Sequence, residues 1–235
     1  MEGILLRRED ADHVRKVLRL RRGALVVAVD AERGLAYHAE LQGSSQGMCV
    51  SLGQEIKSPP AYSPVRTLYQ ALLKGKRSEL VVEKAVELGV HEIFFFESER
   101  SVVRLKSTKD VASKEARLSE VGRGAAAQSK KLVLPSVRVF RSVDAMLSEV
   151  ALSSSFVCAL RPEATPLWQC VKPGSDAIGI IVGPEGDFTV AEYERFISQG
   201  AKPVTLGPYV LRAETAAMAS IAMVFALASR ERTMS

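Results

Sequence analysis

Two hydrophobic patterns follow one another along the chain. In the N-terminal part, short apolar runs rich in β-branched side chains are separated by turns that contain glycine, a pattern typical of strands. We expect a short helix at 13–20 and then three strands, at 25–30, 34–41 and 48–56. The stretch SPPAYSP at 58–64 follows, and its three prolines cannot lie inside a helix or a central strand. The sequence therefore predicts a small β-rich domain at 1–65, ending in a linker, and a second domain at 66–235.

Beyond this linker, continuous apolar runs alternate with amphipathic helical patterns. Strands are expected at 66–73, 92–98, 136–140, 156–160, 177–184 and 202–207. Helices are expected at 78–89, 110–127, 142–150, 189–199 and 215–229. Alternation of this kind, with strands that are apolar throughout, predicts an α/β domain built on a parallel sheet.

Composition narrows the class of protein. The chain has 235 residues, of which 47% are hydrophobic, enough for two domains with cores of their own. We expect a cytosolic protein, because no signal peptide is recognisable and no apolar run approaches the roughly 18 residues that cross a membrane. Three cysteines without a Cys-x-x-Cys pair and three scattered histidines predict neither a metal site nor a redox motif.

The positive charge is unevenly distributed. The whole chain carries a net charge of +5, yet residues 66–141 alone hold 16 basic and nine acidic side chains. A surface of this kind attracts polyanions such as RNA, although a solvated charged face is an equally good explanation of a modest excess.

The segment 177–196 contains the clearest candidate site. An apolar strand runs into Gly183-Pro184-Glu185-Gly186, which must turn, and the next helix is announced by Thr189 and Glu192 at capping-box spacing. Ligands bind at such loops in open α/β sheets. A plain connecting turn is the alternative, and neither a phosphate-binding loop nor a dinucleotide fingerprint is present.

Two further segments carry candidate chemistry. In 204–220 a strand is followed by an apolar loop with Arg212, and Glu214 lies where the last helix begins, a favourable place for a negative charge. An ion pair between Arg212 and Glu214 is the simpler explanation of that arginine. In 74–101 the cluster of Lys74, Lys76 and Arg77 precedes a helix, and either local pairing with glutamates or a phosphate-binding surface would account for it.

Taken together, these segments resemble a known family. The sequences GPEGDF (183–188), LGPYVLRAETA (206–216), KRSELVVEKAVELG (76–89) and SERS (98–101) are similar to those of the RsmE family of ribosomal RNA methyltransferases, in the SPOUT superfamily. The resemblance implies an N-terminal PUA-like β-barrel domain and a C-terminal α/β domain with a trefoil knot. It also implies a homodimer that uses S-adenosylmethionine to methylate N3 of a uridine in 16S ribosomal RNA within the small subunit.

The resemblance further implies which residues form the site. Backbone groups of three loops would bind the cofactor: Val182, Gly183, Pro184, Glu185 and Gly186, then Leu206 and Gly207, then Val210, Leu211, Arg212, Glu214, Thr215 and Ala216. Arg212 is our candidate for a cation that stabilises the deprotonated uracil, and Glu185 for the group that orients the base or accepts its proton. The candidates for RNA contacts are Arg15, Lys16, Arg19, Arg22, Lys76, Arg77 and Lys84.

The chain departs from the family pattern in two places. Asp187 stands where a glycine is usual, and Ala127 stands where a glutamate usually precedes the residue matched by Gln128. Two alternative functions stay open: methylation of another base or of a ribose 2′-hydroxyl in RNA, and RNA binding without catalysis during ribosome assembly.

Overall fold

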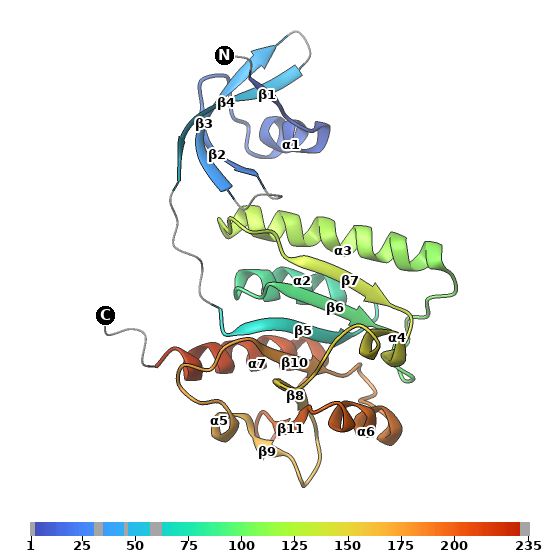
Figure 1. Ribbon diagram of the computed structural model, residues 1–235. Helices are drawn as coiled ribbons and strands as arrows, with labels where there is room; N and C mark the ends of the chain where they lie inside the picture. Colours follow the sequence, from blue (N-terminus) through green and yellow to red (C-terminus); the bar gives the residue numbers. More distant parts are fainter. Residues whose placement is uncertain (1–2, 31–34, 45–46, 57–62, 231–235) are drawn as a thin grey trace. The chain divides into compact units, whose positions relative to one another are not determined.

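The chain forms two compact units. The computed structural model describes residues 3–30, 35–44, 47–56 and 63–230. Contacts divide the chain into Met1–Ala61 and Tyr62–Ser235, here named the N-terminal and C-terminal units (Figure 1). Most of the expected linker lies outside the described residues, and the first strand of the C-terminal unit begins shortly after it, at Val65.

The N-terminal unit is built on a four-stranded antiparallel sheet with the order β1-β4-β3-β2. The strands are β1 (Ile4–Leu5), β2 (Leu25–Asp30), β3 (Leu35–Ser44) and β4 (Gly47–Glu55). Ala39, Leu41 and Val50 form its buried core, because side chains of one strand alternate between the two faces of the sheet. The three predicted strands are therefore confirmed to within a few residues at their ends.

The helix expected at 13–20 lies earlier in the chain. Helix α1 (Arg8–Asp12) continues as a π-helical turn, His13–Val17, and the helical conformation ends before Arg19, whose φ is +51°. Its first turns are polar and are held by ion pairs such as Arg7–Asp10 (2.8 Å) and Asp12–Lys16 (3.0 Å). A search for apolar periodicity could not detect that part of the helix.

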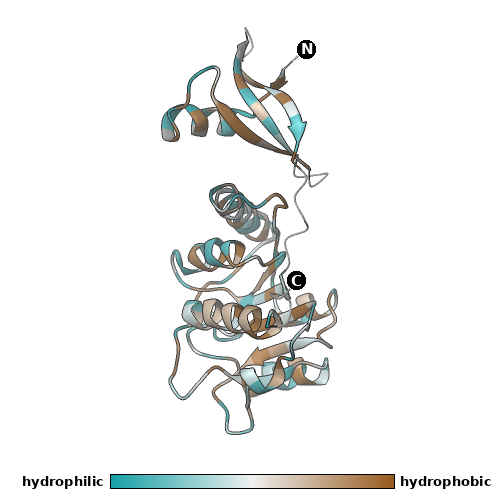
Figure 2. Ribbon diagram, turned by 90° about the vertical axis from the view of Figure 1, so that its left-hand side faces the viewer, coloured by the Kyte–Doolittle hydropathy of each residue, from teal (hydrophilic) through white to brown (hydrophobic). Residues whose placement is uncertain are grey.

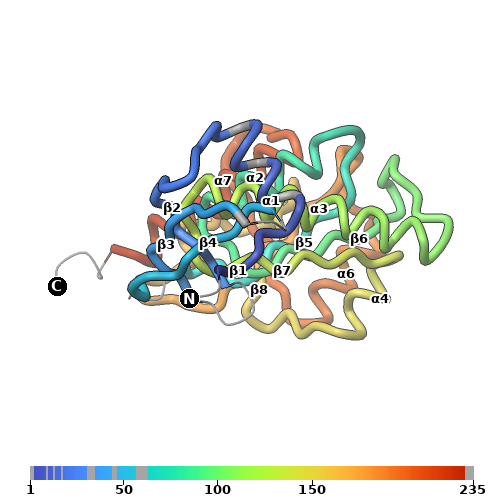
Figure 3. The backbone as a smooth tube through the Cα atoms, turned by 90° about the horizontal axis from the view of Figure 1, so that it is seen from above, coloured from blue at the N-terminus to red at the C-terminus, as the bar shows by residue number. Residues whose placement is uncertain are grey.

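The C-terminal unit contains a seven-stranded sheet whose strand pairs are all parallel. The order is β7-β6-β5-β10-β8-β11-β9. The strands are β5 (Val65–Ala71), β6 (Glu92–Phe96), β7 (Ser136–Phe140), β8 (Ser155–Cys158), β9 (Thr165–Pro166), β10 (Ile178–Val182) and β11 (Lys202–Thr205). The helices are α2 (Arg77–Glu87), α3 (Thr108–Gln128), α4 (Val143–Leu147), α5 (Leu167–Cys170), α6 (Val190–Ser198) and α7 (Ala213–Ala228). The chain can be followed through them in Figure 3.

Helices cover both faces of this sheet (Figures 1 and 2). On β10, Ile178, Ile180 and Val182 belong to one buried cluster together with residues of α2, α3 and α7. Ile181 belongs to a second cluster, with residues of α4 and α6. Because alternate side chains of one strand enter different clusters, β10 is buried on both sides, which explains its uninterrupted apolar sequence.

The predicted elements of this unit are confirmed, with small shifts at their ends. The capping box of α6 is formed as expected: the Thr189 side chain accepts a hydrogen bond from the Glu192 amide, and the Glu192 carboxylate accepts one from the Thr189 amide. The last helix begins at Ala213, two residues before the expected start. Strand β9 and helix α5 were not predicted, because elements of two and four residues are too short to show a periodic pattern.

Close packing inside the sheet gives a test of this fold. A methyl group added at Gly179 would meet the Ser155 hydroxyl and would lie 2.9 Å from Cε2 of Tyr69, both within the core. We predict that Gly179→Ala lowers the free energy of unfolding by about 1–3 kcal/mol. Gly124→Ala, in α3 with no atom within 4 Å of the added methyl, should instead raise it by about 0.5–1 kcal/mol. Urea denaturation measures the free energy of unfolding of both variants. A Gly179→Ala variant as stable as the wild type would contradict the close packing at this position.

Candidate active site

A pocket of about 410 Å³ lies where β8, β10 and β11 end. Because these three neighbouring strands are parallel, the loops that leave their carboxyl ends meet at one edge of the sheet. Each strand contributes its last residue and the residues that follow it: 158–160 from β8, 182–185 and 187 from β10, and 205–207, 209–213 and 216 from β11. Arg77 of α2 completes the lining. The structure thus brings the segments around Gly183, Gly207 and Arg212 together.

Most of the residues expected to bind a cofactor line this pocket. They are Val182, Gly183, Pro184, Glu185, Leu206, Gly207, Val210, Leu211, Arg212 and Ala216. Gly186, Glu214 and Thr215 belong to the same segments but do not line it. Residues 158–160 were missed by sequence reasoning, although they form the carboxyl end of the strand expected at 156–160 and so lie at the edge where ligands bind in parallel sheets.

The loop after β10 has a defined shape. The buried side-chain amide of Gln70 donates to the carbonyl oxygens of Val182 (3.4 Å) and Gly183 (3.2 Å), and the Asp187 amide donates to the carbonyl of Pro184 (3.0 Å). Asp187 has a φ of +60°, and its carboxylate accepts from the following amide, of Phe188 (2.8 Å). Aspartate is one of the few residues that adopts this conformation readily, so Asp187 keeps a turn for which glycine is the usual residue.

Arg77 and Glu185 bind each other. Oε1 of Glu185 accepts hydrogen bonds from Nη1 of Arg77 (2.9 Å) and from the backbone amide of Lys74 (3.1 Å). Nε of Arg77 also lies 3.9 Å from Oε1 of Glu214. Arg77, a candidate for RNA contacts, therefore lies between two carboxylates and connects the start of α2 to two of the pocket segments.

Arg212 is not engaged in the ion pair with Glu214 that sequence reasoning left open. Its side chain is exposed at the start of α7 and takes part in no hydrogen bond or ion pair with any described residue. Glu214 is instead buried beside Arg77, and its Oε2 has no hydrogen-bond partner among the described residues. Arg212 is therefore a cation of the pocket lining that forms no ion pair within the part of the chain that the structure describes.

Cys158 lines the pocket but is poorly suited to covalent catalysis. Burial raises the pKa of its thiol to about 12. At neutral pH the side chain is therefore a thiol, and the thiolate is the nucleophilic form.

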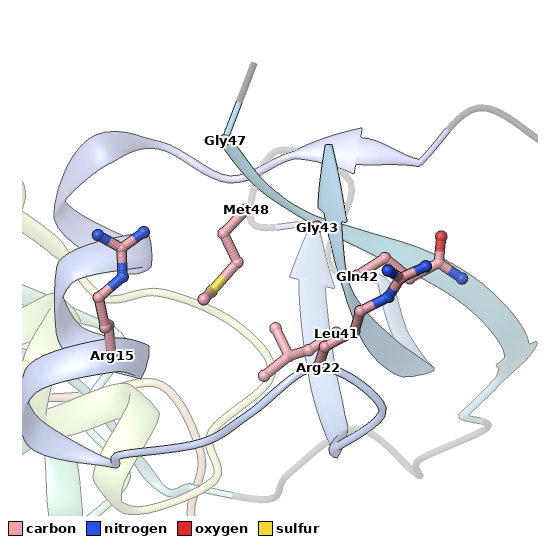
Figure 4. A pocket seen from close by; sticks show the side chains of 7 residues that line it. All are labelled: Arg15, Arg22, Leu41, Gln42, Gly43, Gly47 and Met48. Carbon is pink, nitrogen blue, oxygen red and sulfur yellow. The ribbon is translucent and has the colours of Figure 1, made fainter. Parts of the chain in front are cut away.

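The N-terminal unit contains a second, smaller pocket of about 230 Å³ (Figure 4). Side chains of Leu41 and Met48 point into the space between the helix that carries Arg15 and the strands. Arg22 also lines it. Two of the candidate RNA contacts, Arg15 and Arg22, thus border the same cavity of the N-terminal unit.

The other candidate RNA contacts differ in their surroundings. Lys16 pairs with Asp12, and Lys84 lies 2.7 Å from a carboxylate oxygen of Glu83 and 2.9 Å from one of Glu87. Hydrogen bonds to these two glutamates raise the pKa of Lys84. The side chain of Lys76 is exposed. Lys84 would therefore have to leave two carboxylates in order to bind a phosphate.

Neither a metal site nor a membrane span is found in the part of the chain that the structure describes. No group of three or more His, Cys, Asp or Glu side chains there could hold a metal ion. No helix among those residues has both the length and the apolar character needed to cross a bilayer.

Comparison with known proteins identifies the family. The model of the RNA methyltransferase domain matches residues 62–225, which is most of the C-terminal unit. The chain is 30% identical to ribosomal RNA small subunit methyltransferase E of Mycobacterium bovis, with 94% of this chain and 86% of the relative covered. It is 28% identical to the protein of the same name from Bacillus subtilis, over 92% and 87% of the two chains.

Solved structures agree with this assignment. Ribosomal RNA small subunit methyltransferase E from Neisseria gonorrhoeae, bound to S-adenosyl methionine, superimposes with a TM-score of 0.83 at 28% identity, covering 97% of this chain and 92% of the other. A Legionella pneumophila methyltransferase in complex with the same cofactor gives a TM-score of 0.84 at 26% identity, over 96% and 93%. The chain therefore belongs to the RNA methyltransferase family, with the ribosomal RNA small subunit methyltransferases E.

Proposed function

We propose that this protein transfers the methyl group of S-adenosylmethionine to N3 of one uridine in the 16S ribosomal RNA of the small subunit. The observation that carries the proposal is the single pocket formed by three loops at the carboxyl ends of β8, β10 and β11. Family membership supports the reaction class, and the resemblance in the motifs around Gly183 and Arg212 supports the choice of base.

The residues of the pocket fit such a cofactor. Its volume of about 410 Å³ lies within the range of small-molecule sites, roughly 300–1,000 Å³. Leu206, Val210 and Leu211 offer apolar contacts for an adenine ring, and Gly207, with a φ of +148°, has open space where a side chain would stand. When bound, S-adenosylmethionine supplies an electrophilic methyl group on a positively charged sulfur.

Uracil N3 carries a proton that must leave before the nitrogen can bond to carbon. Both donors to Glu185 are bound to Oε1, which leaves Oε2 to accept the N3 proton. Arg212, with no ion-pair partner among the described residues, would stabilise the negative charge that remains on the base, as cations do in oxyanion sites. The chain thus supplies an acceptor and a cation that line one pocket, while the loops would fix the distance between the reacting atoms.

RNA binding would involve both units. Arg15, Lys16, Arg19 and Arg22 of the N-terminal unit, which we propose to be PUA-like, and Lys76, Arg77 and Lys84 of the C-terminal unit are the candidate phosphate contacts. The target uridine must be unpaired or drawn out of its stack, because N3 is engaged in base pairing in a duplex.

The path of the chain supports a trefoil knot near its end. Strand β10 pairs with one edge of β8. The chain then forms helix α6, and the next strand, β11, pairs with the opposite edge of β8. It then returns as α7, which packs on β10, β5 and α5. A helix that crosses back over strands already placed is what a knotted C-terminal region requires.

The last helix also supports a homodimer. Helix α7 is rich in small residues, and Phe225 remains 42% exposed beside exposed Ala222 and Ala226. We propose that this face meets its counterpart in a second copy.

Sedimentation equilibrium tests the dimer. The wild type should sediment with twice the 25.5 kDa mass of one chain, and Phe225→Glu should shift the equilibrium to monomers, because a charge would be buried in an apolar interface. Val102→Glu, at a side chain that is 61% exposed outside α7, is the matched control. A wild type that sediments as a monomer at micromolar concentration would contradict the proposal.

Nucleoside mass spectrometry tests the reaction itself. Deleting the gene should remove N3-methyluridine from 16S ribosomal RNA, and the purified protein with S-adenosylmethionine should restore it. Loss of a different methylated base or ribose would assign another methyltransferase activity. Unchanged modification, together with RNA binding, would favour the assembly factor without catalysis.

Substitution of Arg212 tests the mechanism. We predict that Arg212→Ala lowers kcat by about 100- to 1,000-fold, the usual effect of removing a group that stabilises developing charge, and leaves cofactor affinity within about threefold. Arg141→Ala, an exposed arginine beyond the pocket, is the control. Calorimetry and single-turnover assays measure the two effects, and unchanged turnover would remove Arg212 from the mechanism.

A further inference from the structure

The segment Ser98-Glu99-Arg100-Ser101 has no part in the chemistry described above, yet it contacts the glycine loop. It follows β6, which is separated from β10 by β5 in the sheet. Nη1 of Arg100 donates to the carbonyl of Gly186 (3.0 Å) and, more weakly, to that of Phe188 (3.5 Å). Two segments 86 residues apart in sequence are thereby joined directly.

These two segments also fit each other closely. A methyl group added at Gly186 would lie 3.3 Å from Cβ and 3.7 Å from the carbonyl oxygen of Arg100. The first distance is shorter than nine in ten real contacts of a Cβ atom. The absence of a side chain at residue 186 therefore lets the backbone of the loop approach the Arg100 segment.

A buried carboxylate strengthens the same connection. Glu192 is only 1% exposed and accepts four hydrogen bonds. Two come from Thr189 and complete the cap of α6, and two come from the Ser98 hydroxyl (3.1 Å) and the Glu99 amide (2.8 Å). Since a buried carboxylate is costly unless its oxygens are hydrogen-bonded, these four bonds join the Ser98–Ser101 segment to the start of α6.

The carbonyls that Arg100 binds lie on either side of Asp187, the residue of the turn with a positive φ. Residues 183–185 and 187 line the pocket, whereas Gly186 and Phe188 do not. Among the described residues, Arg100 alone donates a hydrogen bond to the Gly186 carbonyl. Arg100 thus holds the loop through carbonyl groups of residues that do not line the pocket.

Arg104, which follows this segment, makes a different set of contacts. It binds the carboxylate of Glu97 and the carbonyls of Ser98 and Glu99, all in the connection between β6 and α3. Arg104 therefore stabilises the local conformation around Ser98 and Glu99, whereas Arg100 joins this part of the chain to the loop after β10.

We propose that Arg100 is a positioning residue for cofactor binding: together with Glu192 it holds the Gly183–Asp187 loop in the conformation that accepts S-adenosylmethionine. This inference rests on the proposed function, because it assumes that the pocket is the cofactor site. It assigns a role to the SERS sequence, whose residues do not line the pocket.

The first test separates binding from turnover. Arg100→Ala should weaken cofactor binding about tenfold, as expected from losing a charge-assisted hydrogen bond, while kcat at saturating cofactor stays within about twofold. Arg100→Lys, which keeps one donor, should recover part of the affinity, and Arg141→Ala should bind like the wild type. Isothermal titration calorimetry, initial rates and melting temperature would be measured for each variant.

The second test removes the contact from the other side. Gly186→Ala should also weaken cofactor binding in the wild-type background, because the added methyl displaces Arg100. In an Arg100→Gly background, which lacks the atoms that the methyl would meet first, Gly186→Ala should have a smaller further effect. If the two substitutions lowered cofactor affinity independently, so that their fold-changes multiplied in the double variant, the proposal would be overturned.

The outcomes distinguish this inference from the function on which it rests. A wild type that binds no S-adenosylmethionine contradicts the proposed function. A wild type that binds it and methylates RNA, beside an Arg100→Ala variant of equal affinity, overturns the positioning role alone. A variant that loses kcat and keeps its affinity also overturns it. If Arg100→Ala has a lower melting temperature than the wild type, the cofactor affinities of the Arg100→Lys and Gly186→Ala variants decide whether Arg100 positions the loop.

Discussion

The insertion of β10 between β5 and β8 is the constraint on which the candidate site depends. It places a strand that arrives late in the chain at the centre of the sheet, buried on both faces. The chain then continues to the far side of β8, so that the loops after three neighbouring strands, β10, β8 and β11, leave the same edge of the sheet. A pocket made of backbone loops is the direct consequence, and the surrounding helices supply rigidity more than chemistry.

Long-range hydrogen bonds then give these loops their shape. Gln70 on β5 binds the carbonyls at the end of β10, and Arg77 at the start of α2 joins Glu185 and approaches Glu214. Arg100, after β6, binds the carbonyls of Gly186 and Phe188 in the same turn. Each contact comes from a different part of the fold, so the loop is held in place before any ligand enters, and less conformational entropy has to be lost on binding.

Local signals in the sequence predicted much of this arrangement. The uninterrupted apolar run of β10 indicated a strand buried on both sides, and the Thr189–Glu192 spacing located the start of α6. The partners of Arg77 and Arg100 could not be predicted, because each lies about a hundred residues away and depends on the order of strands in the sheet. For the same reason, residues 158–160 did not stand out until β8 was known to lie beside β10.

The pairing of charges around the pocket follows from the same geometry and bears on catalysis. Spacing along the chain suggested Glu214 as the partner of Arg212, since the two are near neighbours on one segment. In the folded protein Glu214 lies beside Arg77 instead, which also binds Glu185. One guanidinium is thus shared between two carboxylates, and Arg212 forms no ion pair with any described residue. A cation in that position is stabilised most when an anion forms next to it, and the N3-deprotonated base of a uridine is such an anion.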